Sequence, residues 1–401
     1  MGIVDDDVAR VREATDIAAV IGEHVGLKRV GRRLQGLCPF HTEKTPSFSV
    51  NPELGVYHCF GCQASGDAIT FVREIEHLDF VGAVERLAAK AGIQLRYDDR
   101  NEGKQRGRRA RLVEAVAEAV DWYHRRLLEG DDAGAARRYL RGRGLDGDVV
   151  RRFSIGWAPD AWDDLSRHLQ AKKFSREDLV EAGLAFVNRA NRLQDHFRGR
   201  VMFPIFDVAG DPVGFGGRSL SDQGPKYVNT PETSIYQKRR VLYGLNWAKA
   251  DVVAQAEVIV CEGYTDVIAC HLAGAPRAVA TCGTALADEH VRLLKRFASR
   301  VVLAYDADAA GQAAAERFYA WEAEFELQLA VADLGAGRDP ADVWLDDPAL
   351  LLKALDEARP FLQFRIERLL ERADRSTAEG RARAANGGIA LVAEHPDPLV
   401  R

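Results

Sequence analysis

Two short hydrophobic stretches that end on acidic residues decide the fold: Val258-Ile-Val-Cys-Glu262-Gly-Tyr-Thr-Asp266 and Val301-Val-Leu-Ala-Tyr-Asp306-Ala-Asp308. Two further hydrophobic runs, at residues 278–281 and 327–331, continue a series in which short strands alternate with helical segments. Uninterrupted hydrophobic strands that alternate with helices are typical of a parallel sheet covered on both faces. The sequence therefore predicts an open α/β sheet over residues 257–345.

Acidic residues lie where these strands are expected to end. Glu262 follows the first strand, Asp306 and Asp308 follow a second, and Asp339 comes after the last. Active sites of open parallel sheets form outside the carboxyl ends of the strands, so we expect these side chains to lie together. Clustered carboxylates repel one another unless they bind hard cations such as Mg²⁺. The pattern predicts a divalent-metal site, and helix N-capping is the alternative role for an acid such as Asp308.

A second group of metal-binding residue types lies near the N-terminus, in Cys38-Pro-Phe-His41 and Cys59-Phe-Gly-Cys62. Three thiolates and one imidazole are a typical ligand set for tetrahedral Zn²⁺, and four protein ligands indicate a structural ion. Six cysteines in 401 residues are too few for a disulfide scaffold. The alternative is two unrelated pairs of buried cysteines.

Aromatic residues surround these cysteines, at Phe40, Phe48, Tyr57 and Phe60. Aromatic side chains can stack on bases while nearby cations contact phosphates, which is typical of single-strand binding. A small domain also needs aromatic residues in its core. Both roles therefore stay open for each residue.

The overall composition is that of a soluble globular protein, with 47% hydrophobic and 29% charged residues. Lys and Arg total 55 against 60 Asp and Glu, a net charge of −5. No apolar run approaches the roughly 18 residues that span a bilayer. The N-terminus is acidic and lacks the basic region of a signal peptide, so we expect a cytosolic protein.

The charge is unevenly distributed along the chain. Residues 189–249 are rich in Lys and Arg, whereas residues 306–347 are strongly acidic. A basic stretch followed by an acidic one fits a polyanion track that leads to a cation site, and ordinary solvated surface is the alternative. Within the basic stretch, residues 201–206 and 212–216 are predicted to be strands joined by a turn.

The acidic motifs 262–266, 306–308 and 339–340 resemble the Toprim signature shared by bacterial primases, type IA and type II topoisomerases and some nucleases. The cysteine-containing segments 38–50 and 57–62 resemble the zinc-binding domain of DnaG-type bacterial DNA primases.

Three segments of the basic region, 197–205, 214–218 and 225–232, resemble the basic subdomain of the same primases. All the motifs occur in the family's order along the chain. Topoisomerases and nucleases share only the acidic motifs, so the DnaG-type primases are the family that the sequence indicates.

The resemblance, together with the alternation of strands and helices, implies an α/β multidomain fold. Its parts are a zinc-ribbon-like domain over 1–100, a basic linker over 101–111 in whose second half a helix could start, a mixed α+β basic subdomain over 112–250, a Toprim-type parallel α/β sheet over 251–347, and C-terminal helices over 348–401. Family members continue beyond the point that corresponds to Arg401 into a helicase-binding domain. That domain is therefore expected to be absent from this chain.

The function that the resemblance implies is synthesis of short RNA primers de novo on single-stranded DNA, by metal-assisted nucleotidyl transfer. The catalytic residues would be Glu262, Asp306 and Asp308. The same three residues with Asp339 would bind Mg²⁺ or Mn²⁺, with Asp266 and Asp342 in secondary roles. Structural zinc would be bound by Cys38, His41, Cys59 and Cys62. Nucleotide and template would contact Arg198, Arg200, Arg218, Lys226, Tyr227, Asn229 and Lys238.

The implied partners are single-stranded DNA, ribonucleoside triphosphates, a replicative helicase and single-strand-binding protein, at replication forks in the bacterial cytoplasm, with no membrane. A Toprim nuclease or topoisomerase remains an alternative, but Tyr264 lies inside the acidic motif and is a poor catalytic tyrosine for a topoisomerase. A non-enzymatic zinc-ribbon protein would leave the acidic strand ends without a role. A primase–helicase fusion is excluded by the absence of a P-loop.

Overall fold

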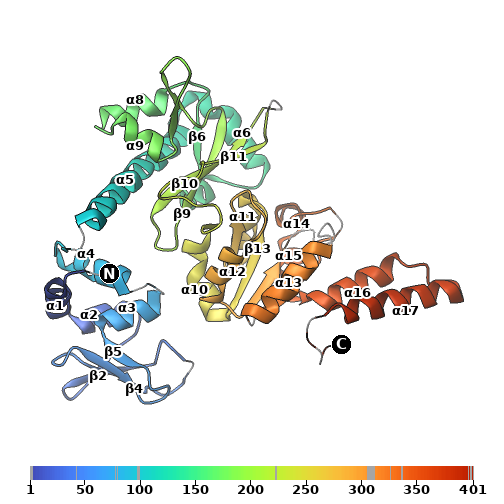
Figure 1. The fold of residues 1–401 in the computed structure, drawn as a ribbon, viewed down its shortest axis with the longest axis horizontal. Helices are drawn as coiled ribbons and strands as arrows, with labels where there is room; N and C mark the ends of the chain where they lie inside the picture. Colours follow the sequence, from blue (N-terminus) through green and yellow to red (C-terminus); the bar gives the residue numbers. More distant parts are fainter. Residues whose placement is uncertain are drawn as a thin grey trace. The chain divides into compact units, whose positions relative to one another are not determined.

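The computed structural model describes residues 3–400 except 42, 77, 79, 97–99, 222–223, 305–311, 326, 336, 396 and 398–399, with the side chains of 100–104, 312–316 and 323 also left out. The chain divides into two compact units, Met1–Arg108 and Arg109–Arg401 (Figure 1). Each unit is described by itself.

The first unit packs four helices against a five-stranded antiparallel sheet. The helices are α1 (Asp5–Ala14), α2 (Ile17–Gly22), α3 (Ala68–Glu76) and α4 (Phe80–Ala91). The strands are β1 (Lys28–Val30), β2 (Arg33–Gly36), β3 (Phe48–Asn51), β4 (Val56–Cys59) and β5 (Ser65–Asp67), in that spatial order.

Aromatic residues form the core of this unit. Phe48 and Tyr57 are buried and stack with ring centroids 5.2 Å apart, and Phe71 of α3 packs on both. Phe60, by contrast, is 60% exposed. Of the two roles that the sequence left open, Phe48 and Tyr57 have the core role, because a small sheet needs its inward-facing rings for burial. The exposed Phe60 stays available for stacking on a base.

The basic segment predicted to be a linker over 101–111 is part of one long helix, α5 (Arg100–Glu129). Its Arg, Lys and Gln residues have high helix propensity, and this outweighs the two glycines at 103 and 107. Arg109 fixes the helix to the second unit by ion pairs with Asp207 (2.7 Å) and Asp211 (3.0 Å).

The second unit begins with a small antiparallel sheet in the order β11-β10-β9-β6. Its strands are β6 (Gly156–Ala158), β9 (Arg200–Phe206), β10 (Pro212–Ser219) and β11 (Tyr227–Asn229), and a separate hairpin joins β7 (Ala185–Val187) to β8 (Leu193–Asp195). Helices α6 (Gly134–Gly142), α7 (Gly147–Arg152), α8 (Asp164–Ala171) and α9 (Arg176–Glu181) accompany it. The pairing of β9 with β10 confirms the predicted strands at 201–206 and 212–216.

The sheet predicted over 257–345 is present as six strands in the order β12-β14-β13-β15-β16-β17. The strands are β12 (Leu242–Tyr243), β13 (Glu257–Cys261), β14 (Ala278–Thr281), β15 (Arg300–Leu303), β16 (Gln328–Val331) and β17 (Arg359–Pro360). The four central strands are parallel and both edge strands are antiparallel.

Helices cover both faces of this sheet, which explains the uninterrupted hydrophobic strands. One face packs on α11 (Tyr264–Ala273), α14 (Pro340–Asp346) and α15 (Pro348–Asp356). The other packs on α10 (Leu245–Gln255), α12 (Asp288–Lys295) and α13 (Gln312–Phe325). The α/β fold class predicted from the sequence is confirmed.

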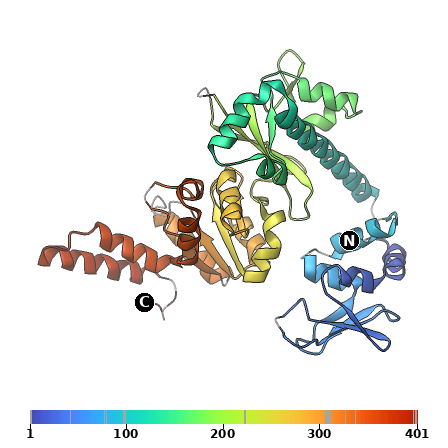
Figure 2. The ribbon, with the colours of Figure 1, turned by 180° about the vertical axis from the view of Figure 1, so that it is seen from behind.

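The chain ends in a helical hairpin formed by α16 (Phe361–Arg372) and α17 (Ala378–Ala393), which lie side by side (Figure 2). Phe361 and Phe364 pack under the sheet, and Arg368 of α16 donates to Asp333 at 3.2 Å. Among the described residues, no helix is long and apolar enough to cross a bilayer.

A buried histidine on α11 predicts acid sensitivity of the second unit. His271 packs edge-on against Phe153, and burial, with a contribution from Arg152, lowers its pKa from 6.5 to about 4. An unfolded histidine binds a proton below pH 6.5 while the native one stays neutral, so the free energy of unfolding should fall as pH drops from 6.5 towards 4. Replacing His271 with Phe should reduce this loss by up to about 3 kcal/mol.

Urea unfolding at pH 7 and pH 5, followed by tryptophan fluorescence, measures the effect in this unit alone, because all six tryptophans lie between residues 109 and 401. Equal pH dependence of the wild type and His271→Phe would contradict the prediction.

Candidate functional site

The four metal-binding side chains near the N-terminus come together as the sequence predicts. The ligand atoms of Cys38, His41, Cys59 and Cys62 all lie within 4.8 Å of one another. The Cys38 and Cys62 sulfurs are 3.8 Å apart, and the Cys59 sulfur is 3.8 Å from Nδ1 of His41. Bonds of about 2.0–2.3 Å to one tetrahedral zinc ion produce such separations. The donor set and its spacing both fit structural zinc.

Tight turns of the chain shape this cluster. The Phe40 N–H points at the Cys38 sulfur and the Cys62 N–H at the Cys59 sulfur, each at 3.4 Å. Such N–H groups stabilise thiolates. Gly61 lies so close to His41 that an added Cβ would be 2.6 Å from Nε2, so only glycine fits there.

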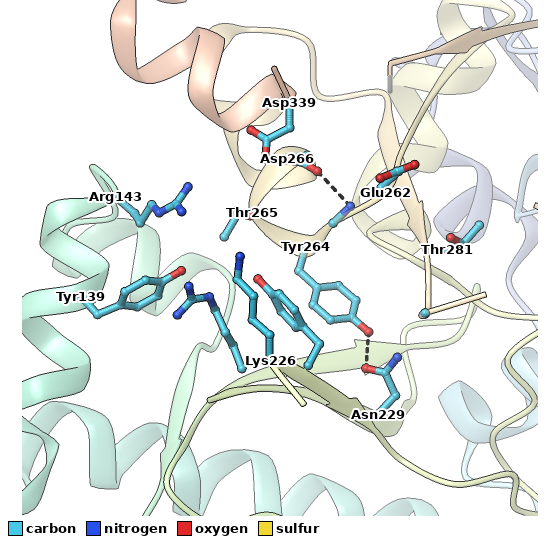
Figure 3. Close-up of a pocket in the computed structure, with 14 residues that line it drawn as sticks. Tyr139, Arg143, Lys226, Asn229, Glu262, Tyr264, Thr265, Asp266, Thr281 and Asp339 are labelled. Carbon is cyan, nitrogen blue, oxygen red and sulfur yellow. Dashed lines mark hydrogen bonds between the residues drawn. The ribbon is translucent and has the colours of Figure 1, made fainter. Parts of the chain in front are cut away.

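The second unit contains a pocket of about 320 Å³ at the carboxyl end of β13. Acidic residues form one side and basic and aromatic residues the other (Figure 3). It is lined by Tyr139, Arg143, Arg218, Lys226, Tyr227, Asn229, Glu262, Gly263, Tyr264, Thr265, Asp266, Thr281, Gly283 and Asp339. Segments far apart in sequence therefore build a single site.

The acidic side is arranged around the start of α11. Glu262 directly follows β13, and the N–H of Gly263 donates to Asp266 at 2.9 Å (Figure 3). Burial, together with the neighbouring carboxylates of Asp339 and Glu262, raises the pKa of Asp266 to about 7. Its Oδ1 atom is buried with no hydrogen-bond partner among the described residues. Mutual repulsion and an unpaired oxygen are what a divalent cation would relieve.

Asp339 caps the next helix on this side. Its side chain accepts the N–H of Asp342 at 2.8 Å and so begins α14. The Asp342 carboxylate instead lies 3.6 Å from Arg143. Asp342 therefore forms an ion pair, whereas Asp339 caps the helix. Asp306 and Asp308 lie outside the described residues, and the part of the chain that is described contains no carboxylate cluster close enough to enclose an ion by itself.

Cations and aromatic rings form the opposite side. The Arg218 guanidinium lies 4.1 Å from the ring centre of Tyr139, a cation–π contact. Burial raises the pKa of Tyr227 to about 12, so its phenol stays protonated. With Lys226 and Arg143, this side offers three positive charges to a polyanion.

A hydrogen-bonded link joins the two sides. Asn229 of β11 accepts from the Tyr264 hydroxyl at 2.7 Å and donates to the Cys282 carbonyl at 2.8 Å (Figure 3). The link ties the small antiparallel sheet to the parallel sheet beside the pocket.

The predicted basic residues are only partly brought together. Arg218, Lys226, Tyr227 and Asn229 line the pocket, whereas Arg198, Arg200 and Lys238 do not. Arg198 pairs with Asp160 at 2.7 Å and lies over Trp162.

Arg200 bonds to backbone carbonyls with its side chain, and Lys238 is bonded to a histidine through its backbone. Arg200 donates to the carbonyls of Gly217 and Pro225 and so anchors the loop that carries Lys226. The carbonyl of Lys238 accepts from His290 at 2.7 Å, which fixes its backbone outside the pocket wall.

Sequence reasoning missed several lining residues. Tyr139 and Arg143 come from α6 and the turn after it, more than a hundred residues before the acidic motifs. Their signal, the short segment Tyr139-Leu-Arg-Gly-Arg143, looks like any basic helix end. Tyr264, Thr265 and Thr281 adjoin the predicted strand ends but are not charged, so charge alone could not select them.

One glycine of β10 makes the pocket possible and predicts a sensitive position. A Cβ on Gly216 would lie 2.0 Å from Cε2 of Tyr264. Replacing Gly216 with Ala should displace that ring and break its bond to Asn229, which should reduce the pocket's affinity for the nucleotide that the sequence resemblance implies by at least about tenfold. Equilibrium binding of a labelled nucleoside triphosphate measures this.

Gly210→Ala is the control. An added Cβ there meets nothing within 4 Å, but the φ of +95° strains alanine, so this variant tests backbone strain without a clash with Tyr264. Equal affinities of Gly216→Ala and wild type would contradict the expectation.

A parallel sheet with carboxylates at its strand ends fits the class of Toprim-containing proteins whose signature the sequence resembles, and the chain also carries a zinc-binding module. Residues 3–103 match the CHC2 zinc finger, residues 122–249 the N-terminal domain of the DNA primase catalytic core, residues 256–333 the Toprim domain, and residues 362–401 the DnaB-helicase binding domain of primase. The chain belongs to the DnaG-type bacterial DNA primases.

Relatives and solved structures agree with this assignment. The chain is 46% identical over 402 residues to a DNA primase of Streptomyces coelicolor, covering 98% of this chain and 63% of the relative. It is 44% identical over 368 residues to a DNA primase of Deinococcus radiodurans, covering 91% and 63%. The chain thus spans less than two thirds of the length of these relatives.

Two solved structures cover different parts of the fold. The zinc-binding and RNA polymerase domains of Aquifex aeolicus primase match with a TM-score of 0.62 and 28% identity, covering 98% of this chain and 93% of that one. The RNA polymerase domain of Mycobacterium tuberculosis primase DnaG, in complex with a double-stranded DNA oligomer with a 6-nucleotide overhang, matches with a TM-score of 0.68 and 39% identity, covering 73% and 94%.

The match of residues 362–401 corrects one expectation. The sequence was expected to lack the family's helicase-binding domain, and this expectation is wrong. The matched segment begins in α16 and includes α17. Helical hairpins of this kind carry only a general amphipathic pattern, so the sequence of these helices did not show that they belong to a helicase-binding domain. The expectation relied instead on the position of the chain end.

Proposed function

We propose that the protein synthesises short RNA primers de novo on single-stranded DNA. The observation that carries the proposal is the pocket at the end of β13, where three carboxylates, three cations and three tyrosines line one cavity. The proposal is supported by primase relatives that align over nearly all of this chain.

Within this proposal, Glu262, Asp306, Asp308 and Asp339 bind Mg²⁺ or Mn²⁺, and the first three are the catalytic residues. Bound divalent metal supplies charge neutralisation at the phosphates and activates the attacking hydroxyl oxygen. Asp266 has a supporting role, because its carboxylate accepts the Gly263 N–H and so fixes the backbone beside Glu262. Asp342 stays a supporting residue on α14.

The basic side of the pocket positions the nucleotide. Arg218 and Lys226 would contact the triphosphate, since their charges face the carboxylates across the cavity. Tyr227 and Asn229 would orient the sugar or base. Arg198, Arg200 and Lys238 remain proposed template contacts, with Arg200 acting on the loop of Lys226 that it anchors. Template affinity should fall steeply with salt.

The first unit would engage the template where synthesis starts. Cys38, His41, Cys59 and Cys62 are its proposed zinc ligands, and zinc there is structural because no coordination position stays open. The division into parts at 100, 111, 250 and 347 is retained as a proposal.

The proposed partners include a replicative helicase, bound through residues 362–401, and single-strand-binding protein. Mycobacterium tuberculosis primase in complex with double-stranded DNA carrying an overhang supports a nucleic-acid ligand for this chain. We propose action at replication forks in the bacterial cytoplasm.

The test is primer synthesis without a preformed primer. The protein is incubated with mixed-sequence single-stranded DNA, labelled ribonucleotides and Mg²⁺ or Mn²⁺, beside Asp306→Asn and Asp308→Asn. Short RNA that disappears in both variants is expected. Cleaved DNA without RNA would overturn the proposal and favour a Toprim nuclease. If neither appears, extension of an annealed RNA primer separates failed initiation from absent polymerase chemistry.

A further inference from the structure

One carboxylate of the zinc module contacts the metal-binding cluster without belonging to it. Oε1 of Glu43 accepts the N–H groups of Cys38 at 2.7 Å and Ser47 at 3.1 Å. Its Oε2 accepts from the Ser47 hydroxyl at 2.5 Å and lies 3.3 Å from Nε2 of His41. The side chain is only 10% exposed. So many directed contacts for a nearly buried carboxylate require an explanation beyond surface charge.

The orientation of the His41 ring provides that explanation. Nδ1 is the nitrogen 3.8 Å from the Cys59 sulfur, and Nε2 points at Glu43. The nitrogen that faces a metal must carry a free electron pair, so the ring proton belongs on Nε2. A carboxylate that accepts this N–H selects the tautomer and fixes the ring plane.

The contacts of Glu43 extend to a third ligand through Ser47. The Ser47 hydroxyl lies 3.2 Å from the Cys59 sulfur while it donates to Glu43. Glu43 therefore reaches the backbone of Cys38, the imidazole of His41 and the neighbourhood of the Cys59 thiolate.

We infer that Glu43 is the positioning residue of the zinc site, which orients His41 and, with Ser47, fixes the knuckle that carries Cys38 before the ion binds. The inference rests on the proposal that the four residues bind zinc. Glu43 is not itself a ligand, because its oxygens are directed at N–H and O–H groups.

Glu43→Gln changes the oxygen that faces His41 and the Ser47 hydroxyl. The amide has the same size and its oxygen can still accept from the Cys38 and Ser47 N–H groups, but its NH₂ group faces the His41 N–H and the Ser47 O–H as a second donor. Glu53→Gln is the matched control, because Glu53 is exposed in the β3–β4 turn of the same unit.

The measurement uses the full chain, loaded with one equivalent of zinc and mixed with excess chelator that reports the released metal. Zinc release from Glu43→Gln should be about 10- to 100-fold faster than from wild type, and release from Glu53→Gln unchanged. In Co²⁺-substituted protein, the visible ligand-field bands should shift in Glu43→Gln and not in the control. A purely structural loss of stability would not shift those bands.

The outcomes separate the two proposals. Wild-type protein that binds no zinc would refute the zinc ligands themselves. Wild type that binds one zinc ion, with equal release rates in Glu43→Gln and Glu53→Gln, would refute the role of Glu43 alone. If Glu43→Gln does not fold, Ser47→Ala is measured in its place, since it removes the contact to the Cys59 sulfur. Wild-type release and unshifted Co²⁺ bands in that variant would overturn the inference.

Discussion

Replacing Glu262 with Gln is expected to reduce primer synthesis at least about 100-fold while leaving the fold intact. The side chain lies at the end of β13 on the acidic wall of the pocket, so glutamine removes charge from the place where the proposed metal binds. It also removes one of the carboxylates that raise the pKa of Asp266, so repulsion in the metal-free site decreases. Activity and stability should therefore move in opposite directions.

The measurement is primer synthesis over a range of Mn²⁺ concentrations, together with urea unfolding of the metal-free protein. Glu357→Gln is the control, because Glu357 is exposed at the end of α15, away from the pocket lining. Wild-type activity of Glu262→Gln at low metal concentration would refute the metal role of this residue.

Replacing Glu257 with Gln should lower the free energy of unfolding of the second unit by about 3 kcal/mol or more. Glu257, at the start of β13, accepts from Arg277 at 2.8 Å and from Arg300 at 2.7 Å. The Arg277 side chain is only 9% exposed, so the variant leaves a buried guanidinium whose remaining counter-charge is the exposed Asp356 carboxylate, 3.8 Å away. Breaking a buried pair on one side is costly for this reason.

Asp356→Asn is the matched control for this prediction. Asp356 also approaches Arg277, at 3.8 Å, but its side chain is 70% exposed, so its loss should cost less than about 1 kcal/mol. Urea midpoints from tryptophan fluorescence compare the two variants. Equal costs would show that burial does not control the strength of this network.

The sequence predicted best those features that depend on neighbouring residues. The zinc cluster follows from two short motifs, and each motif places two ligands by its own turn. The strand before Glu262 was predictable because burial on both faces requires the uninterrupted run that β13 shows.

Features that depend on distant packing could not be predicted in this way. Nothing in the composition indicates that Arg200 donates hydrogen bonds to the carbonyls of Gly217 and Pro225, whereas Arg218 lies on Tyr139 and faces the pocket. All arginines carry the same charge in a sequence, and only the fold determines which guanidinium stays available. The roles of Asp306 and Asp308 still depend on the sequence resemblance.

The order of strands in the parallel sheet has a consequence for biosynthesis. Strand β12 at one edge is made early, whereas β17 at the other edge ends at Pro360, so the sheet is complete only after that residue has left the ribosome. Chains fold from the N-terminus during synthesis. A nascent chain that ends near residue 250 already contains Arg218 and Lys226 but none of the acids that face them. Until Asp339 is made, the growing polypeptide carries these cations without the full set of carboxylates that face them in the finished fold.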